Sequence, residues 1–322
     1  MEPFLKFIPL YQERVWGGQA LGEFLGRPVP AGPPVGESWE IVDRPEAQSH
    51  VAAGPWAGRT LRDVLESDAA GVMGPGWPAA RRFPMLVKWL DCRERLSLQV
   101  HPPAAIAARL GGESKTENWY FACAEPGAAV LAGVRPGVSP AQFAEALHAQ
   151  AVEPLMLRHA VHTGDSLLVR SGTMHAIDAG CLILEIQQNS DTTYRVSDWG
   201  RMGLDGRPRA LHVRESLECL AAAPAEQPRL IPAAEADRVL ADCPEFRIRR
   251  LTLAAGQTLR FGAGEQPRIL SVVAGRLSAE SGGAAVCGRG DNLLLCQQHS
   301  SGFAALEKSV VLITENFHQP AP

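Results

Sequence analysis

The chain divides its apolar residues into short runs, and glycine or proline separates most of these runs. Its 322 residues include 31 glycines and 25 prolines. Short apolar runs between turn residues are typical of an all-β sandwich or barrel, because the turn residues interrupt any long helix. We therefore predict a mainly β fold. The segments that we expect to form strands are 83–91, 95–101, 128–134, 165–170, 181–188 and 193–199.

Helical segments are expected to be few and short. Ser139 before Pro140 is typical of a helix start, because serine caps the first turn and proline fits the first helical position. The segments that favour helix are 59–66, 103–110, 138–149 and 212–221.

A change of composition near residues 222–236 indicates a domain boundary. This stretch, AAPAEQPRLIPAAEA, is rich in alanine and proline and carries no strand pattern, and all seven tryptophans precede it. A second set of expected strands follows it, at 246–253, 268–275, 291–297 and 309–314. We therefore predict two domains, spanning residues 1–225 and 236–322.

The two parts share a local pattern in which Gly-Asp precedes a Leu-Leu strand. It occurs at Gly164-Asp165 and again at Gly290-Asp291, each time with a histidine shortly after the strand. Glycine tolerates the positive φ of a turn, and aspartate can bond the backbone there. The repeated pattern can have arisen either by chance or by an internal duplication of the chain. Together with the two strand sets it favours two jelly-roll barrels in one chain.

Composition excludes several classes of partner. The formal net charge is −4, which gives no general attraction to nucleic acid or to an anionic membrane, so an anionic ligand needs a local basic cluster. Seven cysteines without a CxxC pair indicate reduced thiols rather than disulfides. The first residues lack a signal-peptide core, and no apolar run reaches the roughly 20 residues that span a bilayer. We expect a cytoplasmic protein and leave its oligomeric state open.

The stretch LSLQVHPP, residues 96–103, predicts a strand whose two faces differ in chemistry. Side chains alternate along a strand, so Ser97, Gln99 and His101 share one face opposite the apolar residues. An amide and an imidazole two residues apart can reach the same point. The alternative is structural, since a buried amide and imidazole can also simply bond a loop.

Further potential ligands occur in ESKTENWYF and SGTMHAI. The first offers Lys115 and Glu117 two residues apart, and the second places His175 between two strands that a barrel can bring close. Two imidazoles, a carboxylate and an amide oxygen suit Zn²⁺ with one position open, although Fe²⁺, Mn²⁺ and Co²⁺ accept the same ligands. The other histidines are interpreted as structural: His50, His148, His159, His162, His212, His299 and His318.

The segment CLILEIQQNSDTTYRVSDW adds ionisable groups. Glu185 lies between two apolar residues and is costly to bury without a partner, so it is a candidate for proton transfer or for a salt bridge across the sheet. Asp191 and Arg195 follow at a turn. Arg195 can clamp an anionic group or an oxyanion, or it can tie the loop down through carbonyls.

These segments, in this order, resemble the type I phosphomannose isomerases of the short bacterial form. The resemblance covers most of residues 1–220, and the ordered set of motifs is specific although each motif alone is weak. The matching motifs are RVWGG (14–18), GESWEI (36–41), PMLVKWLD (84–91), LSLQVHP (96–102), KTENWY (115–120), GTMHAI (172–177) and LEIQQNSDTTYRVSDW (184–199).

The resemblance implies a cupin-type enzyme that interconverts mannose 6-phosphate and fructose 6-phosphate with one Zn²⁺ per chain. Carried over motif by motif, it implies the metal ligands Gln99, His101, Glu117 and His175. It further implies the active-site residues Lys88, Lys115, Glu185, Asp191 and Arg195, with Trp16, Glu37 and Ser97 along the sugar pocket. Residues 1–225 would then form the catalytic domain. Residues 236–322 lack a matching ligand set and are predicted to form a metal-free barrel.

Two other functions compete with this interpretation. A non-catalytic bicupin could bind a metal or a sugar, but it needs no acid or base such as Glu185. An iron-dependent cupin oxygenase usually has a ligand set richer in histidine. The sequence thus favours the isomerase with a phosphosugar substrate, and it leaves open which residue moves the proton.

Overall fold

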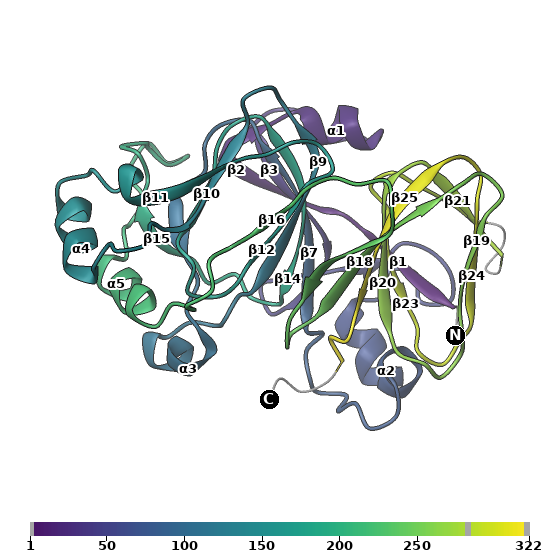
Figure 1. Cartoon of the computed structure of the whole chain (residues 1–322). Coiled ribbons are helices and arrows are strands. Elements are labelled where there is room, and N and C mark those ends of the chain that lie inside the picture. Colours follow the sequence, from purple (N-terminus) through teal and green to yellow (C-terminus); the bar gives the residue numbers. More distant parts are fainter. Residues whose placement is uncertain (1–2, 281–284, 319–322) are drawn as a thin grey trace. The chain divides into compact units, whose positions relative to one another are not determined.

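The chain forms two compact units, each built around its own core. The computed structural model describes residues 3–280 and 285–318. Unit 1 comprises residues 1–10, 39–87 and 234–322, and unit 2 comprises residues 11–38 and 88–233. The mainly β prediction is confirmed, since strands of several sheets make up most of the regular structure (Figure 1).

Unit 2 contains most of a seven-stranded sheet. Three of its strands, β2, β3 and β7, run past the limits of unit 2 along the chain. In sheet order the strands are β16 (Leu230–Ile231), β12 (Ser166–Val169), β9 (Glu117–Ala124), β14 (Cys181–Gln188), β7 (Met85–Cys92), β3 (Val35–Ile41) and β2 (Leu10–Gly18).

A second, five-stranded sheet lies entirely within unit 2. Its strands in order are β11 (Met156–Ala160), β10 (Ala129–Val134), β13 (His175–Ile177), β8 (Leu98–Val100) and β15 (Tyr194–Ser197). The strands pair antiparallel, and Gln99 on β8 lies opposite His175 on one side and Arg195 on the other. Three polar residues from distant parts of the sequence therefore meet across one sheet.

Apolar side chains from both sheets fill the interior of unit 2. Trp119 and Phe121 of β9 are fully buried against Val130 of β10 and Ile177 of β13. Another cluster joins Leu98 and Val100 to the helices described next. Removing this much apolar surface from water is the main force that holds the two sheets together.

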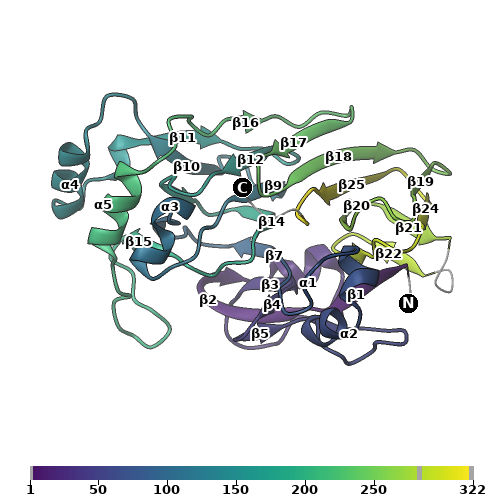
Figure 2. The same cartoon turned by 90° about the horizontal axis from the view of Figure 1, so that it is seen from below.

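The helices of unit 2 are short, and the one that starts after Ser139 is capped as the sequence predicts. Ser139 accepts a hydrogen bond from the Gln142 backbone amide at the start of α4, whose residues Phe143 and Leu147 are buried one turn apart. Helices α4 and α5 lie side by side near β15 (Figure 1, Figure 2). The helices are α1 (Ala20–Leu25), α3 (Ala104–Ala107), α4 (Pro140–His148) and α5 (Val213–Ala221), with 3₁₀ turns at Ala108–Leu110 and Glu153–Leu155.

Unit 1 also pairs a seven-stranded sheet with a smaller one. The larger sheet runs β17 (Arg238–Asp242), β18 (Arg247–Leu253), β25 (Ser309–Glu315), β20 (Arg268–Ala274), β23 (Asn292–Leu295), β1 (Phe4–Ile8) and β6 (His50–Val51). The four-stranded sheet runs β19 (Thr258–Phe261), β24 (Ser301–Ala305), β21 (Arg276–Ala279) and β22 (Val286–Gly288). Helix α2 (Leu61–Met73) and the hairpin of β4 (Asp43–Arg44) and β5 (Ala47–Gln48) complete the unit. Its core is apolar throughout and includes Leu270, Leu293 and Phe303.

The compact units differ in extent from the two domains expected from composition. Strand β1 pairs with β23 in the register Phe4↔Leu295 and Leu5↔Leu294, so the first strand belongs to the unit that holds the C-terminal strands. Composition along the chain cannot report such pairing. The ends of the expected domains, residues 1–2 and 319–322, lie outside the described residues. The catalytic and metal-free roles of the two domains stay predictions.

The linker prediction needs one correction. The stretch 222–236 carries no strand pattern, yet Leu230 and Ile231 form β16 and pair with Leu167 and Ser166. A two-residue strand at a sheet edge is too short to produce an alternating pattern.

Among the described helices, none combines the length and the apolar character that a membrane crossing requires.

The two Gly-Asp turns have the same backbone arrangement. Gly164 and Gly290 both have positive φ, 92° and 97°. The Asp165 carboxylate accepts a hydrogen bond from the His162 amide at 2.8 Å, and the Asp291 carboxylate accepts one from the Gly288 amide at 2.9 Å. The shared sequence pattern therefore corresponds to a shared turn geometry in the two units.

Candidate metal centre and substrate cavity

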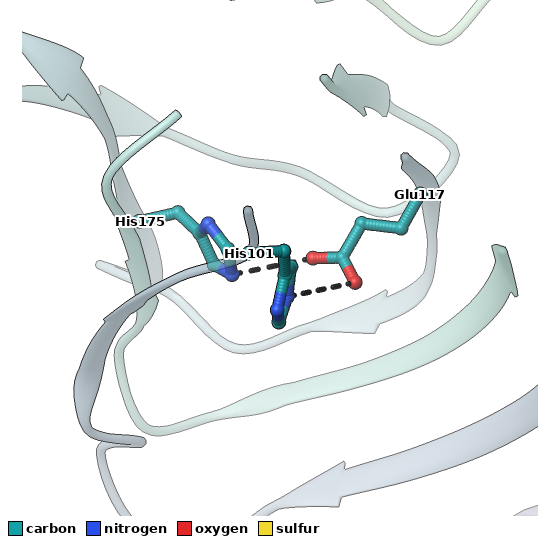
Figure 3. A group of neighbouring side chains, drawn as sticks. All are labelled: His101, Glu117 and His175. Carbon is teal, nitrogen blue, oxygen red and sulfur yellow. Dashed lines mark ion pairs between the residues drawn. The ribbon is translucent and has the colours of Figure 1, made fainter. Parts of the chain in front are cut away.

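Three ligand-type side chains converge inside unit 2 from three different strands. His101 follows β8, Glu117 begins β9 and His175 begins β13, and all three are at most 1% exposed. One nitrogen or oxygen atom from each lies within 4.8 Å of those of the other two. Figure 3 shows both imidazoles turned toward the Glu117 carboxylate. The His101 Nε2 atom is 3.4 Å from Glu117 Oε2, and the His175 Nε2 atom is 3.3 Å from Glu117 Oε1.

Backbone carbonyls fix the tautomer of both imidazoles. His101 Nδ1 lies 2.7 Å from the Thr192 carbonyl oxygen, and His175 Nδ1 lies 2.8 Å from the Thr173 carbonyl oxygen. A carbonyl can only accept, so Nδ1 must carry the hydrogen in each ring. Each Nε2 therefore presents its lone pair toward Glu117, the arrangement in which histidine binds metals.

The protonation of the three residues suits a cation. Burial lowers the pKa of His101 to about 3, assisted by the charge of Lys115, and burial also lowers the pKa of His175. Burial alone would raise the pKa of Glu117, but the Lys115 ammonium together with His101 and His175 outweighs it and holds that pKa well below its usual value. Two neutral imidazoles and one carboxylate result, and these are the forms that bind a metal.

The Glu117 carboxylate is poorly satisfied by the protein itself. Within the described ranges neither of its oxygens accepts a hydrogen bond, although it is fully buried. Lys115 Nζ lies only 2.6 Å from Oε2, as an ion pair without hydrogen-bond geometry. A buried carboxylate that lacks hydrogen bonds and faces two nitrogen lone pairs fits a divalent cation better than it fits a structural role.

Gln99 lies beside this group and reaches it from β8. Its Nε2 donates to the His175 Nε2 atom at 3.2 Å, and its Oε1 accepts from the Ser97 hydroxyl at 3.5 Å. The two ends of an amide are nearly identical in shape. Turning the amide over would direct the oxygen toward His175 and Glu117, so Gln99 can supply a fourth ligand.

Lys115 and Glu185 form a coupled pair next to the ligand group. Lys115 Nζ is 3.5 Å from Glu185 Oε1 and 3.4 Å from His101 Nε2. Burial lowers the pKa of Lys115, but the carboxylates of Glu117 and Glu185 outweigh it and raise that pKa above its usual range. For Glu185, burial and the nearby charge of Glu117 raise the pKa to about 7. The Trp119 indole donates to Glu185 Oε2 at 3.1 Å and fixes the carboxyl group.

A cavity of about 410 Å³ opens over these residues. Its volume lies within the range of small-molecule sites, about 300–1,000 Å³. Lys115, Glu185 and Gln99 form part of its lining, whereas the His101, Glu117 and His175 side chains lie behind them. A ligand in the cavity would thus meet Lys115, Glu185 and Gln99, and two of these contact the buried histidines: Gln99 contacts His175, and Lys115 contacts His101.

Acidic residues surround Lys88 in the same cavity. Its Nζ lies 3.6 Å from Asp191, 3.7 Å from Glu37 and 4.0 Å from Glu185. Glu37 is held in turn by Arg14, whose guanidinium donates to both carboxylate oxygens at 3.0 Å. These carboxylates largely balance the positive charge of Lys88, so Lys88 attracts a further anion only weakly.

A second wall of the cavity is cationic. Arg195, Arg209 and His212 line it together, and Arg195 Nε is buried without an acceptor among the described residues. Arg195 donates through Nη1 to the Ala210 carbonyl at 2.9 Å, which confirms part of the loop-tying alternative. An anionic group of a ligand is best accommodated at this wall.

All nine cavity residues named from the sequence lie along this one cavity. They are Trp16, Glu37, Lys88, Ser97, Gln99, Lys115, Glu185, Asp191 and Arg195.

The sequence interpretation missed Arg14, Thr193 and Arg209 in the lining and assigned His212 a structural role only. His212 both accepts a hydrogen bond from the Arg195 amide at 3.1 Å and faces the cavity. The available signal was the high arginine content of residues 195–209.

Comparison with known proteins points to one family. Residues 4–128 match the family described as phosphomannose isomerase type I, catalytic domain. Mannose-6-phosphate isomerase ManA of Bacillus subtilis is 37% identical over 218 residues, which cover 67% of each chain. Curated relatives are 37–39% identical, and the matched segments span about two-thirds of their length, 65–67%.

Solved structures extend the likeness to the whole fold. The crystal structure of the mannose 6-phosphate isomerase from Bacillus subtilis has a TM-score of 0.83 and 28% identity, covering 98% of this chain and 100% of its own. A mannose 6-phosphate isomerase bound with zinc and yttrium has a TM-score of 0.72 at 17% identity, covering 98% of this chain and 99% of its own. On the sequence identity and the matching fold, the chain belongs to the type I phosphomannose isomerase family.

Proposed function

We propose that this protein is a zinc-dependent aldose–ketose isomerase that interconverts mannose 6-phosphate and fructose 6-phosphate. The observation that carries the proposal is the buried His101–Glu117–His175 group beneath a cavity lined by Lys115 and Glu185. Relatives named mannose-6-phosphate isomerase support the same substrate pair. The free thiols of all seven cysteines support a cytoplasmic location.

We assign one Zn²⁺ per chain to Gln99, His101, Glu117 and His175. Two imidazole nitrogens and two side-chain oxygens suit zinc, and a relative of the same fold is described as bound with zinc. When bound there, the metal would supply positive charge that stabilises negative charge developing on the substrate oxygens. The protein residues are left to move the proton and to hold the sugar.

The proton transfer is assigned to the pair of Lys115 and Glu185. Isomerisation moves a proton between C1 and C2 of the open-chain sugar through a cis-enediol. A pKa of about 7 lets Glu185 both accept and release a proton near neutral pH, whereas the raised pKa of Lys115 keeps that residue charged. Glu185 is therefore the better base, and the Lys115 ammonium stabilises the enediol oxygen. Asp191 is 44% exposed and faces Lys88, so it ranks lower.

The substrate phosphate is assigned to the cationic wall. Arg195 and Arg209 lie there, whereas Lys88 is surrounded by three carboxylates. Arginine presents a planar fork of donors that matches phosphate oxygens. Trp16, Ser97 and the Arg14–Glu37 pair then bound the sugar between its two ends.

A coupled assay distinguishes this function from the two alternatives. The purified protein is stripped of metal, reloaded with zinc or iron, and supplied with mannose 6-phosphate. We expect fructose 6-phosphate to form with zinc and no oxygen uptake with iron. Oxygen consumption with iron would indicate an oxygenase. Metal and sugar binding without turnover would indicate a binding protein.

A further inference from the structure

The orientation of His101 depends on a segment remote from it in sequence. Its Nδ1 donates to the carbonyl of Thr192, 91 residues away, whereas His175 donates to Thr173, only two residues away in its own turn. The loop between β14 and β15 therefore determines where the His101 ring points. Anything that releases this carbonyl would release one metal ligand and leave the other in place.

Ser190 bonds the backbone of Thr192, the residue that carries this carbonyl. Its hydroxyl accepts a hydrogen bond from the Thr192 amide at 3.2 Å and donates to the Glu113 carbonyl at 3.2 Å. The Glu113 amide donates in return to the Thr192 hydroxyl at 3.0 Å. One hydroxyl thus links the loop after β14 to the segment that leads into Lys115 and Glu117.

Burial makes these bonds hard to replace. Ser190 is 1% exposed, and Gln187 beneath it is fully buried. The Gln187 side-chain amide donates to the carbonyls of Gln188 and Ser190, both at 2.7 Å, and thereby stabilises the turn. Water cannot readily substitute for a lost partner at such a position, so the loop would shift instead.

We infer that Ser190 is a positioning residue for the metal centre, which it serves by fixing the Thr192 carbonyl that orients His101. The inference rests on the metal site of the proposed function. Partners that orient a metal-binding histidine typically contribute 10–100-fold to metal affinity. Because Asp191 and Thr193 flank Thr192 and line the cavity, the same loop also faces the substrate.

The test compares the zinc affinity of the full chain with that of Ser190→Ala, using competition with a chromophoric chelator. We expect zinc to bind about 10–100-fold more weakly to the variant. Ser139→Ala is the matched control, because its hydroxyl also accepts one hydrogen bond and donates one, at the start of α4. The control should bind zinc as the unsubstituted chain does.

A second readout needs no zinc. Nitrogen NMR of the metal-free protein should show His101 protonated at Nδ1 in the unsubstituted chain and a mixture of tautomers in Ser190→Ala. If Ser190→Ala does not fold, Thr192→Val removes the hydroxyl that holds Glu113 and should weaken zinc binding about tenfold, the lower end of the same range.

Equal zinc affinity and an unchanged His101 tautomer in a folded Ser190→Ala protein would overturn the positioning role. Failure of the unsubstituted chain to bind zinc would instead count against the proposed function. The tautomer measurement then still decides whether Ser190 orients His101. The two failures are therefore distinguishable.

Discussion

Backbone carbonyls, rather than acidic side chains, orient the two imidazoles of the metal site. The Thr192 and Thr173 carbonyls hold the Nδ1 hydrogens, so each Nε2 lone pair faces Glu117. A neutral carbonyl adds no further negative charge behind the ring, so a Zn²⁺ ion bound here with Glu117 as its single carboxylate ligand would leave a net charge of +1. Such a site is suited to stabilising an enediolate oxygen.

Replacing His101 with alanine should remove both the metal and the activity. The side chain supplies one of three buried ligands, and Lys115 Nζ lies 3.4 Å from its Nε2 atom. Zinc affinity should fall by more than about 100-fold, the upper range for merely supporting partners. Elemental analysis and turnover of mannose 6-phosphate check this. A His101→Ala protein that retains one zinc per chain would refute the ligand assignment.

Substitutions of Lys115 and Glu185 should affect the rate more than substrate binding. Both Glu185→Gln and Lys115→Met should lower kcat by about 10²–10⁴, typical of a lost acid or base, with KM and zinc content nearly unchanged. Steady-state kinetics with zinc analysis measure this. Asp191→Asn is the comparison, because Asp191 is more exposed, and it should cost much less. Unaltered kcat in all three variants would contradict the isomerase mechanism.

The raised pKa of Glu185 also predicts a pH-dependent stability. The unfolded chain releases this proton near pH 4.5, the ordinary glutamate value, and the folded metal-free protein near pH 7. As pH rises through this window the unfolded state loses its proton first, so ionisation favours unfolding. Compared with Glu185→Gln, the unsubstituted metal-free protein should therefore lose stability between pH 4.5 and 7. Denaturant titrations of both proteins measure the difference between their free energies of unfolding. If the pKa of folded Glu185 is ordinary, this difference should not change between pH 4.5 and 7.

The sequence predicted correctly which way some of the site residues point. Period-two alternation placed Ser97 and Gln99 on the cavity side of β8, with Leu98 and Val100 in the core. Arg209 and His212 were not predicted, because they reach the cavity through a loop, and loop residues carry no periodicity from which their direction can be read.

At the scale of elements, the loop from Asp198 to His212 supplies Arg209 and His212 to the cationic wall, beside Arg195 of β15. The Asp198 carboxylate is buried and accepts from Arg209 Nε at 2.7 Å and from Arg201 Nη2 at 2.8 Å. Burial would raise the pKa of Asp198, but these hydrogen bonds outweigh it and lower that pKa. Trp199 lies at the start of the loop, and the Arg95 guanidinium stacks on its ring, 3.7 Å from the ring centroid. One carboxylate thus aims an arginine at the cavity.

Asp198→Asn should loosen this wall and weaken substrate binding. Asparagine keeps the shape but loses the charge that holds Arg209, so KM for mannose 6-phosphate should rise about tenfold, close to the cost of one hydrogen bond to a charged group. The turnover number should change little. Asp205→Asn is the control, since Asp205 accepts a hydrogen bond from the Arg207 amide on the same loop and is absent from the cavity lining. Equal KM values for both variants would contradict the role of Asp198.

Each segment expected to form a strand or a helix contains one, whereas many strands were not predicted, among them all those before residue 83. The capped helix α4 begins at Pro140, one residue after the expected Ser139 cap, and β14 spans the expected residues 181–188. Strand β9 was not predicted as a strand although Glu117–Ala124 is central in its sheet. It is buried along most of its length, so its polar residues Glu117 and Asn118 do not alternate with apolar ones.

At the scale of the whole molecule, the predicted ligand set occurs in only one of the two units. The apolar side chains between the sheets of unit 1 include Leu270 and Phe303, and the described residues contain no second cluster of three metal-ligand side chains. Chain order did not predict how the units are composed, because β1 pairs with β23 from the other end of the sequence. We therefore predict one metal per chain.

Zinc titration of the metal-stripped protein, with turnover of mannose 6-phosphate recorded at each addition, tests the account most directly. One occupied site at Gln99, His101, Glu117 and His175 predicts no turnover without metal and a linear rise that stops at one zinc per chain. Turnover that persists in the stripped protein, or that keeps rising to two zinc ions per chain, would contradict a single catalytic zinc held in unit 2.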